Sequence, residues 1–300
     1  MIKRYLRKLL PVKLRVFLSK VEDFLLFDIY AYCVVRPSLA RKLRRRQQPS
    51  EYLFVLSPAR SGSSLLCNVL NSHPEITGYG ESHTGYVSSV DLDKLICRTA
   101  VLLDDFDALS HKYVMDKMVR NYLLSDDILH NERVKFIFLL RDPSATYRSM
   151  VKLFSGYGSS DGVDQWISYY KERLEYFEEL AIRINNSQRC LTVRYEDLLE
   201  DTDETLALLQ DFLDTKAPFS DSYTAAKTAG RLKYGDNSSS IKSGKILRRK
   251  ASRPVLNEGV FAVDKQDFVY RLQANCFETL KQYTQGAVRL SEAFSSFVFG

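Results

Sequence analysis

The chain has 300 residues and a formal net charge of +6; 45% of its residues are hydrophobic and 27% are charged. These values are ordinary for a soluble globular protein and allow either one large α/β domain or two small ones, each with a sizeable core. Five scattered cysteines without CxxC or Cys/His spacing argue against a disulfide framework or a zinc site and indicate free thiols in a reducing compartment. No stretch reaches the ~20 apolar residues that cross a bilayer, and no secretory signal is recognisable. We therefore expect a cytoplasmic protein.

The positive charge lies at the N-terminus. Residues 1–50 carry 13 Lys and Arg against three acidic residues, a net of +10, whereas the rest of the chain has a net of −4. Apolar residues in 1–35 recur at spacings of three and four, which predicts basic amphipathic helices. Two interpretations stay open: helices packed on the domain with their basic face in water, or contact with an anionic membrane through residues 1–46. The run 41–49 is expected to be a solvated linker, and nucleic acid is not expected as a partner.

From residue 51 onward the chain reads as one domain, 51–300, distinct from the N-terminal segment 1–50. Buried strands are predicted at 52–56, 136–140 and 190–193, and helices at 63–71, 164–184 and 204–213. Strands that alternate with helices indicate an α/β fold with a mainly parallel, doubly wound sheet flanked by helices. The Ser/Lys/Arg-rich stretch 235–253 is expected to be a mobile loop.

The turn between the first predicted strand and helix has the composition of an anion site. Small residues at 61–64 let several backbone N–H groups point at one anion, and the helix that follows adds its positive end. Arg60 supplies a permanent cation. A serine-rich turn with a helix N-cap is the structural alternative. A P-loop nucleotide kinase needs GxxxxGK[ST], and the first Gly and the Lys of that fingerprint are both missing here.

The segment Pro58-Ala59-Arg60-Ser61-Gly62-Ser63-Ser64 resembles the 5′-phosphosulfate loop of sulfotransferases that use 3′-phosphoadenosine-5′-phosphosulfate (PAPS). Three further segments resemble family motifs in the family's order. They are Arg141-Asp142-Pro143 with Ser149, Arg194-Tyr195-Glu196-Asp197-Leu198, and Gly235 to Lys245. The resemblance spans roughly residues 52–255. It is closer to the bacterial carbohydrate and tyrosylprotein branches than to the cytosolic branch, which has Lys in place of Arg60.

The resemblance implies a sulfotransferase with a P-loop-like phosphate loop that moves a sulfuryl group from PAPS to an acceptor hydroxyl, yields PAP and requires no metal. It assigns cofactor binding to Pro58, Ala59, Arg60, Ser61, Gly62, Ser63 and Ser64 for the 5′-phosphosulfate, to Arg141 and Ser149 for the 3′-phosphate, and to Tyr195, Lys245 and Arg253 for further contacts. The acceptor stays open among a carbohydrate, a lipid, a small molecule and a peptide tyrosine. A nucleotide kinase and a non-enzymatic membrane-associated binding protein are the alternative functions.

Glu81 is our first choice for the general base, because it follows a Gly-rich loop at the C-terminal side of the sheet, where α/β sites open. A lone Glu in a loop is more often a solvated surface group. His83 is the second candidate for the base. The resemblance implies that Lys117 and Arg60 contact the transferring group and that Ser240, or else Ser238 or Ser239, contacts the leaving phosphate. Four aromatic residues are expected either to form a sugar-stacking platform or to belong to the core. They are Tyr157, Trp166, Tyr169 and Tyr170.

Overall fold

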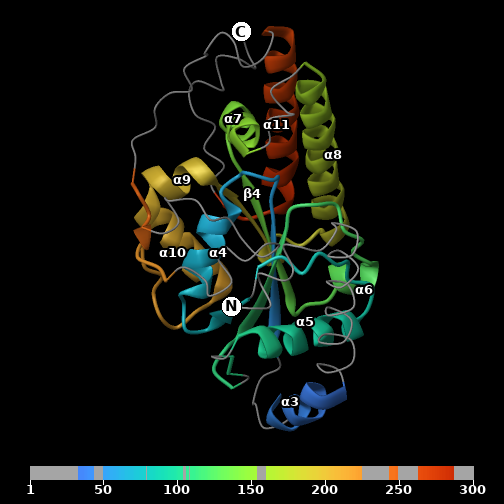
Figure 1. Ribbon diagram of the computed structural model, residues 1–300, viewed down its shortest axis with the longest axis vertical. Coiled ribbons are helices and arrows are strands. Elements are labelled where there is room, and N and C mark those ends of the chain that lie inside the picture. The colour runs from blue at the N-terminus through green and yellow to red at the C-terminus, as the bar shows by residue number, and fades with distance from the viewer. Residues whose placement is uncertain are drawn as a thin grey trace, which may run out of the picture.

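The computed structural model describes residues 33–43, 50–78, 80–103, 106–107, 109–153, 160–224, 243–248 and 263–286. A central sheet is flanked by helices (Figure 1). Several predictions fall outside the described residues, namely the helices of 1–32, Tyr157, Ser238, Ser239, Ser240 and Arg253. In the described part of the chain, no helix combines the length and the apolar character needed to cross a membrane.

The sheet has five strands, all parallel, in the order β2-β3-β1-β4-β5. The strands are β1 (Glu51–Leu56), β2 (Ile76–Thr77), β3 (Tyr113–Met118), β4 (Val134–Leu140) and β5 (Cys190–Arg194). The helices are α3 (Arg36–Leu43), α4 (Ser63–Asn71), α5 (Ser89–Leu102), α6 (Asp126–Leu129), α7 (Pro143–Leu153), α8 (Ser160–Ile184), α9 (Tyr195–Glu200), α10 (Thr202–Leu213) and α11 (Val263–Tyr283), with a 3₁₀ turn at Ser187–Arg189. The three predicted strands, the three predicted helices and the α/β fold class are confirmed.

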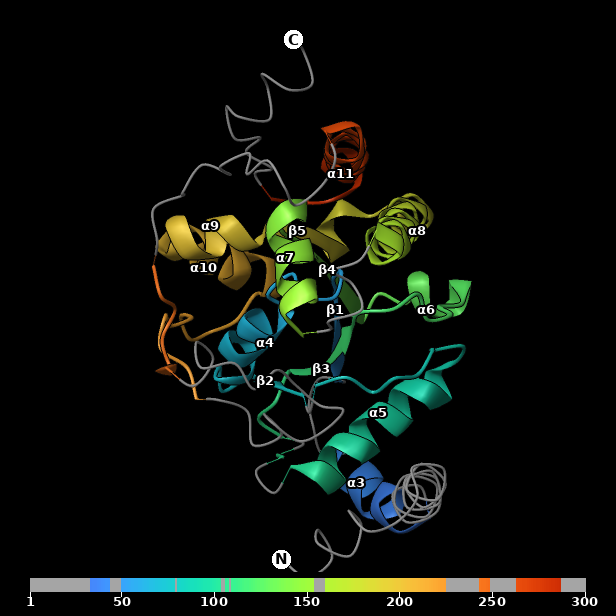
Figure 2. The ribbon, with the colours of Figure 1, turned by 45° about the horizontal axis from the view of Figure 1, so that its top comes forward.

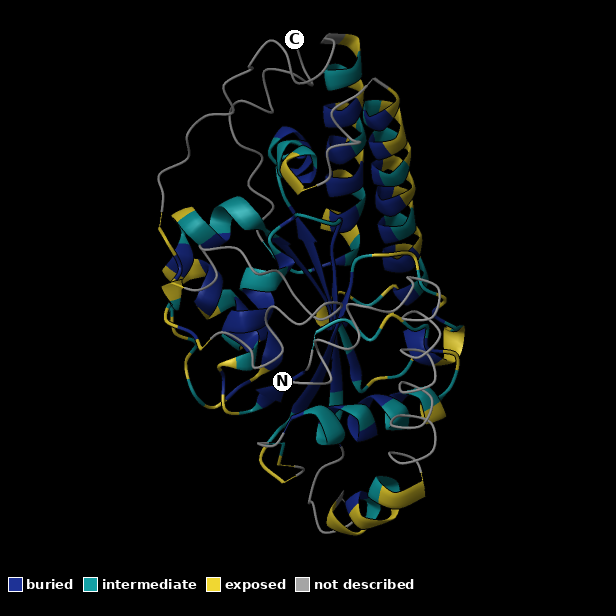
Figure 3. Cartoon of the chain, in the orientation of Figure 1, coloured by how far each residue is buried: buried dark blue, intermediate teal, exposed yellow. Residues whose placement is uncertain are grey.

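The sheet separates two apolar cores. On β1, Leu53 and Val55 pack with α4, α9 and α10, while Tyr52, Phe54 and Leu56 pack with α5, α8 and α11. Successive side chains of a strand point to opposite faces, so a strand that is covered on both faces must be apolar throughout. Figure 2 shows α4, α9 and α10 on one side of the sheet and α5, α6 and α8 on the other. Figure 3 shows the strands buried between them.

This strand order places the predicted phosphate loop at the carboxyl end of the central strand, β1. The chain runs from β1 through α4 to β2 and β3 on one side, and then crosses to β4 and β5 on the other. The carboxyl end of β1 is therefore the point at which the strand order reverses, and ligands of open α/β sheets bind at such a point.

Two expectations are revised by the structure. Arg41 and Lys42 belong to the last turn of α3 and not to a linker, since Leu39 is buried against the core and Arg36 pairs with Asp93 of α5 at 3.0 Å. Residues 44–49 of the predicted linker are not described.

Of the stretch 235–253, predicted to be a mobile loop, the structure describes only residues 243–248, and these are anchored to the core. Ile246 is buried in the α10 core, and its N–H donates to the Asp221 carbonyl at 2.7 Å. Trp166 and Tyr170 have no exposed surface and stack with ring centroids 4.8 Å apart, so they belong to the core and not to a sugar platform.

Candidate functional site

The loop between β1 and α4 turns through two residues of positive φ. Arg60 has φ 69° and Gly62 has φ 86°. A Cβ at residue 62 would lie 2.1 Å from the Tyr195 ring, so this position requires glycine both for its backbone angle and for its neighbour. A non-glycine residue held in the left-handed region, as Arg60 is, is typical of functional sites.

Helix α8 supports this loop from the side. The Tyr169 hydroxyl accepts from the Ala59 N–H at 2.7 Å and donates to the Val119 carbonyl at 2.9 Å. One turn further along, the buried Arg173 guanidinium donates to the carbonyl oxygens of Ser57, at 3.2 Å, and of Met118. Burial lowers the pKa of Arg173 to about 10. The two α8 side chains thereby tie the start of the loop to the end of β3.

The residues predicted to bind the nucleotide lie together on the β4 side of the loop. Arg60 Nε donates to Ser149 Oγ of α7 at 3.1 Å, and Arg141 donates to the Arg60 carbonyl at 3.1 Å. The Arg141 guanidinium also lies over the Tyr195 ring, 4.5 Å from its centroid. Four residues from four separate segments thus form one group of contacts.

Two residues that the sequence analysis missed hold the end of β4 behind this group. The Asp142 N–H donates to Glu196 Oε1 at 3.0 Å, and Gln273 Nε2 of α11 donates to the Arg141 carbonyl at 2.8 Å. Burial raises the pKa of the Glu196 carboxyl. The position of Glu196 directly after Tyr195 could have indicated its place, whereas no local pattern connects Gln273 with Arg141.

Three of the predicted catalytic residues, Glu81, Lys117 and His83, lie on the β3 side of the loop, whereas Arg60 belongs to the group on the β4 side. Lys117 Nζ is 2.8 Å from Glu81 Oε1 and 3.4 Å from Ser64 Oγ. Lys117 is 5% exposed and Glu81 is 17% exposed. His83 Nδ1 lies 3.6 Å from Glu81 Oε2 and 3.2 Å from the Tyr122 hydroxyl. Glu81 therefore lies between a buried ammonium and an imidazole.

The loop and its surroundings have the character of a polyanion site. Ser57 Oγ, Ser61 Oγ and Arg141 Nε are buried and have no hydrogen-bond partner among the described residues. Such atoms are uncommon in folded proteins and are explained when a ligand accepts the bond. Guanidinium groups, an ammonium and backbone N–H groups at a helix start are the donors that bind phosphate and sulfate. No group of acidic, His or Cys side chains able to hold a metal ion occurs in the described parts of the chain.

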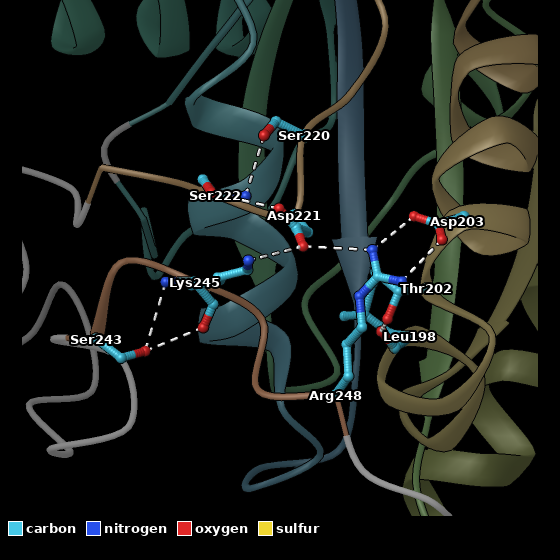
Figure 4. Close-up of polar contacts among 9 residues, drawn as sticks. All are labelled: Leu198, Thr202, Asp203, Ser220, Asp221, Ser222, Ser243, Lys245 and Arg248. Carbon is cyan, nitrogen blue, oxygen red and sulfur yellow. Dashed lines mark hydrogen bonds and ion pairs between the residues drawn. The ribbon is translucent and has the colours of Figure 1, made fainter.

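Lys245 lies in a different group of contacts from the phosphate loop. Its Nζ is 3.6 Å from Asp221, and Arg248 pairs with both oxygens of Asp203, at 2.8 and 2.7 Å, and with Asp221 at 3.3 Å (Figure 4). These contacts fasten residues 243–248 to α10 and to the segment that follows it. The cofactor role of Lys245 stays a prediction.

Comparison with known proteins shows similarity to sulfotransferases. Residues 98–221 match the model of a family described as "Sulfotransferase family", and this span includes Lys117, Arg141, Ser149 and Tyr195. A Caenorhabditis briggsae protein with the name "Putative protein-tyrosine sulfotransferase" is 21% identical over 188 residues, 55% of this chain and 65% of that protein. This chain therefore spans about two-thirds of the length of that curated relative.

Three solved structures with a similar fold are described as sulfotransferases or as a sulfotransferase domain. The sulfotransferase domain of the Synechococcus PCC 7002 olefin synthase is 18% identical with a TM-score of 0.48, and covers 76% of this chain and 98% of its own. A sulfotransferase from Alicyclobacillus acidocaldarius is 12% identical with a TM-score of 0.46, at 80% and 98% coverage. A mouse sulfotransferase in complex with PAP is 15% identical with a TM-score of 0.40, at 87% and 92% coverage.

Proposed function

Since residues 98–221 match the sulfotransferase family model, we propose that the chain is a sulfotransferase that transfers a sulfuryl group from PAPS to an acceptor hydroxyl. One observation carries this proposal: the phosphate loop joins two groups of contacts made by residues from distant parts of the sequence. Arg60, Arg141, Ser149 and Tyr195 form the group on one side, and Ser64, Lys117 and Glu81 form the group on the other.

The first group fits the nucleotide. When bound, PAPS supplies a sulfuryl group that is already attached to an activated phosphate carrier. The turn 57–64 and Arg60 would hold its 5′ end, while Arg141 and Ser149 would hold the 3′-phosphate and Tyr195 would support the nucleotide. Ser61 Oγ and Arg141 Nε, which lack partners among the described residues, would then gain anionic acceptors.

The second group fits the transfer step. Positioning and charge stabilisation dominate in the related phosphoryl transfers. Lys117 Nζ lies between Ser64 of the loop and Glu81, so it can stabilise negative charge that develops at the transferring group. Glu81 would take the proton of the acceptor hydroxyl, with His83 as the alternative base.

The test of this arrangement is the substitution Glu81→Gln, which keeps the size of the side chain and removes its basicity. We expect turnover to fall by roughly 10²–10⁴-fold, the usual contribution of a general base. The affinity for PAP should stay nearly unchanged, because Glu81 contacts Lys117 and not the Arg141 group. Turnover is measured with labelled PAPS on acceptors found by screening, and affinity by calorimetry.

Two further variants separate the roles. Arg60→Ala should lower both PAP affinity and turnover, since Arg60 serves the donor before and during transfer. His83→Ala should retain most activity. If His83→Ala abolished turnover while Glu81→Gln behaved like wild type, His83 would be the base. If neither mattered, the assignment of the β3 side as the acceptor side would be wrong.

A further inference from the structure

Asp116 is a buried carboxylate that the proposed reaction does not use. It precedes Lys117 on β3, so the two side chains point to opposite faces of the sheet. Lys117 contacts Ser64 and Glu81, whereas Asp116 contacts Ser82 and Tyr86. We infer that Asp116 is a positioning residue that holds Glu81 against Lys117, an inference that rests on the proposed role of Glu81 as the base.

The contacts of Asp116 fix the residue directly after the base. Its Oδ1 accepts from the Ser82 N–H at 2.8 Å, and its Oδ2 accepts from Ser82 Oγ at 2.5 Å. The Tyr86 hydroxyl donates to the same Oδ2 at 2.7 Å. Three donors from one short loop therefore meet a single carboxylate, which fixes both the backbone and the side chain of Ser82.

These contacts set the register of the loop against β3. The Lys117 N–H donates to the Gly80 carbonyl at 3.0 Å, beyond the point where β2 pairs with β3 through Thr77 and Val114. Glu81 then meets Lys117 on one face of the strand, and Ser82 meets Asp116 on the other. Two consecutive loop residues are thus matched to two consecutive strand residues. A shift of the loop by one residue would break both pairs together.

A buried carboxylate lowers the stability of the folded state unless it is compensated, so its presence inside the sheet argues for a role beyond packing. Asp116 is 1% exposed, and this burial raises the pKa of its carboxyl to about 6. The negative charge of Glu81 also raises the pKa, whereas the hydrogen bonds from Ser82 and Tyr86 lower it. Tyr122 and Cys67 are further titratable groups whose pKa the Asp116 charge raises. A buried charge without a function is more cheaply replaced by an apolar side chain. Asp116 instead has three donors, from Ser82 and Tyr86, and lies on the strand next to the partner of the proposed base.

The experiment is a double-mutant cycle of Asp116→Asn and Glu81→Gln. Asparagine has one acceptor oxygen, so at least one of the contacts with Ser82 and Tyr86 is lost or reversed. Transfer of label from PAPS is first measured with a monosaccharide, a tyrosine peptide, a phenol and an aliphatic alcohol as acceptors, and with water alone as the blank. The acceptor that gives the highest rate is then used for all variants. In the wild-type background we expect Asp116→Asn to lower kcat by roughly 10²-fold, the effect of a misplacement of about 1 Å. The Kd for PAP should be unchanged.

In the Glu81→Gln background, Asp116→Asn should cause little further loss, because a residue that acts only through Glu81 has nothing left to position. An equal loss in both backgrounds, no loss in the wild-type background, or a loss of PAP affinity would each overturn the inference. Asp93→Asn, at a surface ion pair with Arg36, is the matched control and should leave kcat unchanged. If Asp116→Asn does not fold, Ser82→Ala and Tyr86→Phe each remove one donor and must show the same non-additivity.

The cycle also separates failure of this inference from failure of the proposed function. A wild-type kcat for Glu81→Gln would remove both the proposed base and the role of Asp116. A large loss for Glu81→Gln combined with additive behaviour of Asp116→Asn would remove the positioning role alone.

Discussion

Arg141 combines contacts within the fold with a buried donor that these contacts do not use. It donates to the Arg60 carbonyl, lies over the Tyr195 ring, and keeps a buried Nε without a partner among the described residues. Arg141→Ala should weaken PAP binding by about 2–5 kcal/mol, the range for loss of one partner of a desolvated charge pair. Adenosine 5′-phosphosulfate lacks the 3′-phosphate, so its binding should change much less. Calorimetry with both ligands checks this, and equal losses would show that Arg141 serves only the fold.

Asp116 should also give the protein a recognisable pH dependence. Its pKa is about 6 in the folded chain and about 3.9 in an unfolded chain. Between these values the folded state binds more protons, so the contribution of Asp116 to stability falls as the pH rises from about 4 to about 6 and is constant above that. The free energy of unfolding of wild type relative to Asp116→Asn should therefore decrease across this window. Urea titrations at several pH values measure it, and a relative stability that rises with pH would contradict the raised pKa.

The site residues divide into those with a local sequence signal and those without one. The positions of Arg141, Tyr195 and Lys117 could be predicted because their segments resemble motifs of a known family, and that of Glu81 also because it follows a loop at the C-terminal side of the sheet. Asp116 and Arg173 could not, because only the tertiary fold brings them near their partners, which are Ser82 and Tyr86 for Asp116 and the Ser57 and Met118 carbonyls for Arg173. For Lys245, a motif position predicted contact with the cofactor, whereas in the structure its side chain contacts Asp221.

At the scale of elements, α8 acts as the support of the phosphate loop. Arg173→Met keeps the long side chain but removes the donor of the buried Ser57 carbonyl and leaves the Met118 carbonyl with the Ser57 N–H alone. Each unsatisfied buried group costs about 1–3 kcal/mol, so we expect a clear fall in melting temperature and in PAP affinity together. Lys171→Met, on the exposed face of the same helix, is the matched control and should change neither by much. A destabilised Arg173→Met that binds PAP as tightly as wild type would show that α8 does not shape the loop.

The elements also show which patterns reveal structure in the sequence. Strands β1 and β4 were predictable because burial on both faces requires a continuous apolar run. Helix α8 was predictable because burial of one face places apolar residues at spacings of three and four. Strand β3 carries Asp116 and Lys117 in its second half, so charged residues interrupt its apolar run, and β2 has only two residues. Helix α11 packs on α8 and supplies Gln273. It was not predicted, because polar and apolar residues alternate irregularly along it and it lies outside the segments that resemble family motifs.

At the scale of the molecule, the topology explains why these residues meet. The strand order reverses at β1, which brings the carboxyl ends of β1, β3 and β4 to one edge of the sheet. The loop 57–64, Lys117 and Arg141 follow or end these three strands, so a single edge collects the cations. The net charge of the chain does not reflect this arrangement, because its excess lies in the first 50 residues.

The most direct test of the central claim is the melting temperature of the intact protein in the presence of nucleotides. A ligand that binds only the folded state raises the melting temperature with its concentration. PAP should do so without added Mg²⁺, and the increase should be largely lost in Arg141→Ala. ATP with Mg²⁺ should have a much smaller effect. Stabilisation by ATP with Mg²⁺ and none by PAP would contradict the sulfotransferase assignment and favour a nucleotide kinase.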